Sequence, residues 1–336
     1  MHTEIDILEN EIFEQYPEVL DILLRDHTTQ QNIFWATNNY EHLGEAYSFK
    51  SQILPALITG DNGNLIMPRV QKAKFLQQSR LKDMAEVFTP SWICNTQNNL
   101  IDNAWFQKKK VFNKEVKLSD GSYRWKVNSN KITFPKGKTW KHYVRDKRLE
   151  ISCGEAPYIT SRYDTTKGVF ISIENRIGIL DRKLRVINEN VHTTGEWLKA
   201  TQTAYKNTYA YEWQGDSLLL AREAMLVTFI ENYNRKFDKE PLLKSIQYIA
   251  YIISWNVWQM DGLKGVVPNS CVDKDVIAVN LFGEIETNYI TCKGCENGDI
   301  TKHNNGLYCL IKDWSNKDKH TGITGKQIKF VELLKK

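Results

Sequence analysis

The chain has 336 residues, of which 41% are hydrophobic and 25% are charged, a composition that fits a soluble protein with one large domain or two modest ones. No stretch approaches the roughly 20 apolar residues that cross a bilayer, and the polar start from Met1 to Asn10 is unlike a signal peptide, so we expect no membrane partner. Six scattered cysteines do not form a disulfide framework and favour a cytoplasmic location, while a net charge of +5 excludes no class of partner.

Residues 1–85 are predicted to be a mainly helical N-terminal region. Between Ile5 and Leu24, apolar residues recur at helical spacing, with a break at Pro17. Further along, the sequence from Asp61 to Gly63 indicates a turn.

A basic, aromatic-rich segment at 105–148 is predicted to be an insertion. Its basic residues are Lys108, Lys109, Lys110, Lys114, Lys117, Arg124, Lys126, Lys131, Lys136, Lys138, Lys141, Arg145, Lys147 and Arg148. Its aromatic residues are Trp105, Phe106, Phe112, Tyr123, Trp125, Phe134, Trp140 and Tyr143. Positive charge suits a phosphate backbone and the rings could stack on exposed bases, which makes DNA the expected partner. The alternative is a surface hairpin whose aromatic side chains pack inward.

From Arg148 onward, short apolar runs alternate with longer helical patterns. The predicted strands are 148–152, 169–173, 210–213, 253–259 and 276–279, and the predicted helices are 180–205, 217–233 and 241–252. Such alternation is typical of an α/β domain with a largely parallel sheet. We place this domain at 86–285.

Three of these predicted strands end in motifs that suit a nucleotide cofactor. The first runs into Ser152-Cys153-Gly154, a small-residue turn that lets backbone amides approach a ligand. The second ends at Glu212, which could accept ribose hydroxyls or could simply favour the following helix N-terminus. The third precedes Asp261, which could accept a hydrogen bond from an adenine amine or could be a turn residue before Gly262.

This order of motifs resembles the gamma class of DNA adenine-N6 methyltransferases. That class carries a Phe-Thr-Pro motif upstream, matched here from Glu86 to Ile93. The resemblance runs from about Leu23 to Asn269 and extends to bacterial and phage modification subunits of restriction systems. It implies a Rossmann-like, S-adenosylmethionine-dependent methyltransferase domain behind the helical N-terminal region. The cofactor residues that it implies are Thr89, Pro90, Glu150, Ser152, Cys153, Gly154, Glu212 and Asp261.

The chain departs from the family in two places. The step from Gly154 to Glu212 is long, so Glu174 after the run 169–173 is a competing ribose ligand. The family's catalytic loop has Pro-Pro between an Asn or Asp and an aromatic residue, and here the nearest match is Asn280-Leu281-Phe282. The resemblance implies that Asn280 accepts a hydrogen bond from the target amine and that Phe282 stacks on a flipped base.

Loss of the two prolines leaves a second function open. A catalytically degenerate subunit would use the same fold to bind cofactor, DNA or a partner protein, such as a specificity or restriction subunit. A nuclease is less favoured, because the chain holds no well-spaced Asp and Glu-x-Lys run in strand context.

The C-terminal tail, residues 286–336, holds a candidate metal knuckle. Cys292 and Cys295 form a Cys-x-x-Cys, with His303 and Cys309 downstream. Two thiolates at this spacing, with a further Cys and a His, predict a structural zinc ion in a stretch too polar to fold unaided. Ordinary free cysteines are the alternative.

Overall fold

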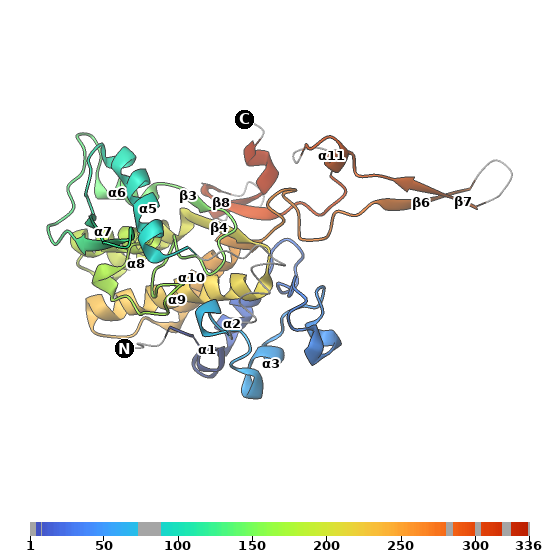
Figure 1. Ribbon diagram of the computed structural model, residues 1–336, viewed down its shortest axis with the longest axis horizontal. Helices are drawn as coiled ribbons and strands as arrows, with labels where there is room; N and C mark the ends of the chain where they lie inside the picture. The colour runs from blue at the N-terminus through green and yellow to red at the C-terminus, as the bar shows by residue number, and fades with distance from the viewer. Residues whose placement is uncertain are drawn as a thin grey trace.

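In a computed structural model of the chain, residues 5–7, 9–72, 89–279, 285–299, 304–317 and 324–334 are described. The protein is a mixed α/β molecule in which helices surround several small sheets, one of them parallel (Figure 1).

The parallel sheet has three strands in the order β3-β4-β5, and two helices lie between each pair of consecutive strands. The strands are β3 (Arg148–Glu150), β4 (Thr208–Glu212) and β5 (Val257–Gln259). The helices are α7 (Ile179–Asn190), α8 (Thr194–Lys206), α9 (Gly215–Phe237) and α10 (Leu243–Asn256). Because parallel neighbours need such crossovers, the alternating pattern in the sequence correctly predicted this part of the fold.

Three predicted boundaries change. The single helix expected over 180–205 is two, because Thr193 caps a new helix by accepting the Glu196 N–H. Residues 253–256 continue α10 and leave only three residues for β5. The strand expected over 169–173 is wrong: Phe170 makes one isolated bridge to Tyr163, and a 3₁₀ turn begins at Ile173.

The N-terminal region contains short helices joined by irregular chain. They are α1 (Glu9–Gln15), α2 (Pro17–Leu24), α3 (Pro55–Ile58), η1 (Glu41–Leu43), η2 (Glu45–Tyr47), η3 (Gly60–Asn62) and η4 (Arg69–Gln71). The break expected at Pro17 is confirmed, since α2 begins there. Arg222 on α9 ties this region to the sheet, because its buried guanidinium donates to carbonyls of Leu23, Arg25 and Val257.

The basic segment follows a long helix and folds as a hairpin and a short helix. These elements are α5 (Ser91–Phe106), β1 (Asn113–Lys117), β2 (Tyr123–Val127) and α6 (Trp140–Arg145). Phe106, Phe112 and Tyr143 are buried, and their rings contact one another with centroids 5.2–5.8 Å apart. The prediction that these rings stack on bases is therefore wrong. They pack inward, while the lysines remain exposed.

The tail is built from two antiparallel pairs. One pair is β6 (Lys274–Val279) with β7 (Ile285–Ile290), and the other is β8 (Leu310–Lys317) with β9 (Thr324–Lys329). Two short helices, α11 (Lys293–Glu296) and η6 (Phe330–Leu334), lie after β7 and after β9. The β6–β7 hairpin projects from the body, whereas β8 lies against it (Figure 1). Ile311 and Phe330 pack with Tyr211 and Trp258 of the parallel sheet. No helix in the described ranges is long and apolar enough to cross a membrane.

A buried polar contact joins α5 to α7 and so fixes the segment that precedes the sheet. Arg182 donates to Asp102 (2.6 Å), Asn95 (2.9 Å) and Asn99 (2.9 Å). Asp102 also accepts the Tyr143 hydroxyl at 3.0 Å. Both charges are almost fully buried, and Asp102 also forms an ion pair with Arg148 at 3.5 Å, so burial of these groups depends on their pairing.

We predict that Arg182→Leu lowers the free energy of unfolding by about 1–3 kcal/mol, because Asp102 loses a buried charged hydrogen bond and keeps only its longer ion pair with Arg148 at 3.5 Å. Urea unfolding measures this loss. The exposed Arg145→Leu is the control and should change stability by less than about 0.5 kcal/mol. Equal effects of the two substitutions would contradict the buried network.

Candidate cofactor-binding site

The carboxyl ends of the three parallel strands meet at one edge, and each strand ends in a polar residue. β3 ends at Glu150, β4 at Glu212 and β5 at Gln259. In register, Glu150 pairs with Ala210 and Glu212 with Gln259. Because open α/β sheets bind ligands beyond this edge, the strands place the predicted residues Glu150 and Glu212 where a ligand would lie.

The turn after β3 has a strained backbone. Ser152, Gly154 and Ala156 have positive φ angles of 48°, 54° and 57°, whereas Cys153 and Glu155 between them do not. A non-glycine residue held in this region costs about 1–3 kcal/mol, and such strain concentrates at ligand sites. A β-carbon built on Gly154 would meet nothing within 4 Å, so the turn faces open space.

Glu212 fixes this turn to the neighbouring strand. Its Oε2 accepts the Gly154 N–H at 2.7 Å, and its Oε1 accepts the N–H groups of Trp213 (2.9 Å) and Gln214 (3.3 Å). The Cys153 N–H donates to the carbonyl of Tyr211 at 2.9 Å. A carboxylate offers about four acceptor positions, and three are used here. Glu212 therefore supports the backbone at the start of α9 and still has room for one further donor.

The Glu150 side chain is half-buried. Part of it reaches solvent, but the carboxyl oxygen Oε2 is buried and has no hydrogen-bond partner among the described residues. Burial raises the pKa of Glu150 well above its ordinary value of 4.5; N–H groups of Tyr158 and Ile159 lower it, and the nearby Glu212 raises it further. Since buried polar atoms are normally paired, this unpaired oxygen suits a donor supplied by a ligand.

The upstream motif lies against the chain that follows this turn. Pro90 is the N-cap of α5, and the carbonyl of Thr89 accepts the Thr165 hydroxyl at 3.1 Å. The Cys94 thiol donates to the same Thr89 carbonyl at 3.6 Å. The structure thus joins Thr89 to Thr165, in the chain that follows the predicted cofactor loop. Residues 86–88 of the motif lie outside the described residues.

Asp261 lies two residues beyond β5 and adopts the turn geometry that was its alternative interpretation. Its Oδ1 accepts the N–H groups of Leu263 (2.9 Å) and Lys264 (3.2 Å), and its backbone pairs with Val266. Its role toward adenine stays a prediction.

The N-terminal region borders the same edge. Gln259 accepts the Phe34 N–H at 3.1 Å and donates to the carbonyls of Phe34 and Trp213, both at 2.8 Å. The Gly215 N–H donates to Trp35, and a β-carbon on Gly215 would lie 2.2 Å from the Phe34 carbonyl oxygen. Close packing at a glycine therefore holds the Phe34 segment beside the start of α9.

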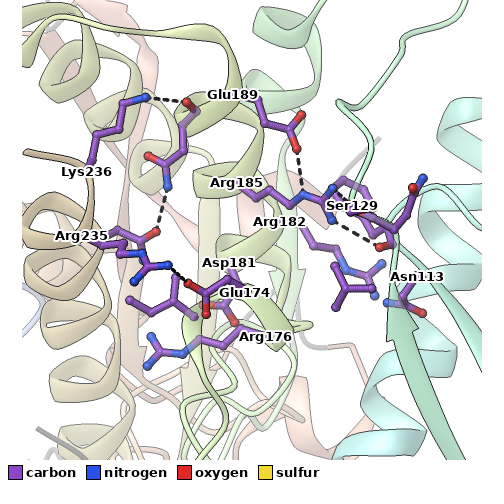
Figure 2. A pocket seen from close by; sticks show the side chains of 16 residues that line it. Asn113, Ser129, Glu174, Arg176, Asp181, Arg182, Arg185, Glu189, Arg235 and Lys236 are labelled. Atoms are coloured by element: carbon purple, nitrogen blue, oxygen red, sulfur yellow. Dashed lines mark hydrogen bonds and ion pairs between the residues drawn. The ribbon is translucent and has the colours of Figure 1, made fainter. Parts of the chain in front are cut away.

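Glu174, the competing ribose ligand, lies elsewhere. It is exposed and forms an ion pair with Arg235 near the end of α9 (Figure 2). Because the strand expected before it does not form, Glu174 does not end a strand of the parallel sheet. The fold therefore gives no support to Glu174 as the ribose ligand, and the role of Glu212 toward ribose stays a prediction.

Glu174 lines a cavity of about 550 Å³ between α7, the end of α9 and the β1–β2 hairpin. Its arginines are partnered by carboxylates: Arg176 by Glu231, Arg182 by Asp102, Arg185 by Glu189 and Arg235 by Glu174. Two of these pairs are drawn in Figure 2. Paired guanidinium groups offer little net attraction for an anion, so we do not assign the cofactor to this cavity.

The predicted catalytic residues Asn280 and Phe282 lie outside the described residues. The strand that leads to them, β6, pairs with β7 in a two-stranded sheet of its own. Their catalytic role stays a prediction.

The predicted metal ligands are regrouped. Sγ atoms of Cys271, Cys292 and Cys295 lie within 4.8 Å of one another. Cys309 is buried in the apolar cluster of Tyr211 and Trp258 and donates to the Gln259 carbonyl at 3.3 Å. Cys271 therefore takes the position predicted for Cys309, and His303 lies outside the described residues.

Sequence reasoning missed Glu155 beside the turn. Its carboxylate is buried, accepts the Arg69 N–H at 2.7 Å and accepts the Tyr163 hydroxyl at 2.5 Å. An acid inside a small-residue turn was the available signal, but its partner at Arg69 is too distant in sequence to be inferred.

Comparisons of the chain with protein-family models, with curated proteins and with solved structures found no match.

We predict a pH-dependent contribution of Glu150 to stability. A carboxyl whose pKa is raised on folding stabilises the protein fully below its unfolded pKa and loses that contribution as pH rises through the folded value. Relative to Glu150→Gln, the wild type should therefore lose stability from about pH 4.5 upward, by at most about 1.4 kcal/mol per pH unit. Urea unfolding over a pH series measures the free energy of unfolding of both proteins. If the wild type instead becomes more stable than Glu150→Gln as the pH rises, the prediction is refuted.

Proposed function

We propose that the chain binds S-adenosylmethionine at the carboxyl edge of β3 and β4, in a Rossmann-like methyltransferase domain. The observation that carries this proposal is the convergence of a strained turn and two buried strand-end carboxyls at one edge of the sheet, with Thr89 bonded to the chain that follows the turn. The residues fit such a group, since Glu150 Oε2 lacks a donor and the space beside Gly154 is open.

In this proposal each part of the site has a task. Thr89 and Pro90 would contact the methionine part, and the turn formed by Ser152, Cys153 and Gly154 would lie beside the cofactor. Glu212 would accept a ribose hydroxyl, and Asp261 would lie near the adenine ring. When bound, the cofactor supplies an electrophilic methyl group attached to a sulfonium sulfur.

The activity that we infer is adenine-N6 methylation of DNA in a restriction-modification setting. An adenine must leave the base stack to be modified, which costs a few kcal/mol. The predicted acceptor Asn280 and stacking residue Phe282 would orient the amine, and no metal is required for the transfer.

The second candidate function is a cofactor-binding subunit that does not transfer the methyl group. The structure favours it in one respect: after β5 the chain turns at Asp261 and enters the separate β6–β7 hairpin. Methyl transfer from labelled cofactor to DNA of mixed sequence distinguishes the two. If the protein binds the cofactor but transfers no label to DNA, the second candidate function is the correct one.

We predict that Glu212→Ala weakens S-adenosylmethionine binding by about 1–3 kcal/mol, the usual loss for a charged hydrogen bond. Calorimetry on the full chain measures it. Because Glu212 also holds the Gly154 N–H, Glu212→Gln serves as a second variant that keeps the size and one acceptor. Glu174→Ala, at the rejected ribose position, is the matched control and should leave the affinity unchanged. A wild type that binds no cofactor at millimolar concentration overturns the proposal.

The basic hairpin supports DNA as the partner. On its exposed face Lys114 stands directly opposite Lys126, with Arg124 beside them opposite Val116. Like charges in cross-strand positions are destabilising, so their retention is explained if a polyanion lies across them. The inward-packed rings would then stiffen the hairpin and leave the contact to backbone phosphates.

We predict that replacing Lys114, Arg124 and Lys126 together by Gln weakens nonspecific DNA binding and flattens its dependence on salt. Each lost phosphate contact should reduce the slope of log affinity against log salt by about 0.9. Fluorescence anisotropy over a salt series measures both quantities. The same substitution at the exposed Lys199, Lys239 and Lys244 controls for net charge, and equal slopes for the two triple variants would reject the hairpin as the contact.

A further inference from the structure

Three cysteines from two separate stretches of chain converge at the base of the β6–β7 hairpin. Cys271 precedes β6, and Cys292 and Cys295 follow β7. The Cys271 Sγ lies 3.3 Å from that of Cys292 and 3.6 Å from that of Cys295. These separations far exceed a disulfide bond of about 2.05 Å. They approach the edge of a zinc tetrahedron, which is about 3.8 Å for Zn–S bonds of 2.3 Å.

Backbone groups around the cluster are directed at sulfur. The Asn305 N–H donates to Cys292 Sγ at 3.3 Å. The Cys292 N–H donates in turn to the Asp273 carboxylate at 3.1 Å. Donors to sulfur favour the thiolate, which is the form that binds metal. The same pattern of N–H donors orients thiolate ligands in metal sites.

Close packing brings the third stretch of chain to the cluster. A β-carbon on Gly306 would lie 3.0 Å from Cys271 Cβ and 2.9 Å from the Ser270 Oγ. The Leu307 N–H donates to that same Ser270 Oγ at 3.0 Å, and Asn305 Nδ2 donates to the Val272 carbonyl at 3.2 Å. The loop at 304–307 thus clasps Cys271 against the knuckle of Cys292 and Cys295.

Short elements and polar loops make up the described residues around the cluster. The knuckle helix α11 has only four residues and lies beside the projecting β6–β7 hairpin (Figure 1). Of the described cysteines, Cys94, Cys153 and Cys309 are buried in other surroundings, so the grouping of three is specific to this place.

We propose that Cys271, Cys292 and Cys295 form a structural zinc site that fastens the β6–β7 hairpin to the body. Thiolates are soft ligands that select zinc over magnesium or calcium. A bound ion would replace the apolar core that this stretch lacks. The described residues supply three ligands, and the fourth position of the tetrahedron is left unassigned.

The test compares Cys271 with Cys309. Spacing in the sequence predicts Cys309 as a zinc ligand, whereas the geometry of the structure favours Cys271. Full-length protein without a metal-binding tag is purified under reducing conditions, and its zinc is measured by mass spectrometry. We expect about one zinc per chain in the wild type and in Cys309→Ala, and a large loss in Cys271→Ser and Cys292→Ser. Retention by Cys271→Ser with loss by Cys309→Ala would overturn the assignment.

Hydrogen exchange tests the same site in the wild-type protein, so its result does not depend on how well a variant folds. Chelation of wild-type zinc should speed amide hydrogen exchange in β6, β7 and α11 and leave α9 and α10 protected. Reduced wild-type protein without zinc overturns the site. A disulfide among these cysteines, detected by mass and by thiol titration, also overturns it. None of these outcomes depends on cofactor binding or methyl transfer, so the zinc site and the proposed function fail independently.

Discussion

The carboxylate of Glu212 joins two parts of the backbone that are far apart in the sequence. It accepts the Gly154 N–H from the turn after β3, and the Trp213 and Gln214 N–H groups from the start of α9. Removing one of these bonds would leave a buried N–H unsatisfied, at about 1–3 kcal/mol. Because β4 is the central strand of the sheet, this one side chain sets the position of the turn relative to both neighbouring strands. The candidate site depends on it even before any ligand is considered.

The remainder of that edge stores unfavourable energy. Ser152 and Ala156 hold positive φ angles, and Glu150 has a buried oxygen without a donor. A turn whose only task was to connect β3 to α7 could use glycine at all three positions and avoid a buried acid. Strain and an unpaired acceptor at the same place are more simply explained by a ligand that supplies donors.

Periodicity predicted the parallel strands and their helices because each lies in a continuous local pattern with its own caps. It failed at 169–173, where the apolar run makes only the isolated bridge between Phe170 and Tyr163 and ends in a 3₁₀ turn that begins at Ile173. The predicted metal ligands show the same limit. Spacing along the chain made Cys309 an attractive ligand, but the Cys309 N–H bonds to Gly265 and directs its side chain into the cluster of Tyr211 and Trp258. Only the approach of Gly306 to Cys271, a contact set by packing, identifies the third cysteine.

The path of the chain after β5 determines how the site could act. Asp261 closes a turn onto Val266, and the chain then enters the β6–β7 hairpin instead of adding a fourth parallel strand beside β3. The edge of the parallel sheet rests on α9 and α10, whereas β6 and β7 pair with each other in a separate two-stranded sheet. In the proposed zinc site, Cys271, Cys292 and Cys295 would fasten this hairpin at its base. The proposed catalytic residues Asn280 and Phe282 follow β6 in the sequence, so under the proposed function the hairpin and the parallel sheet would have to act on the same substrate.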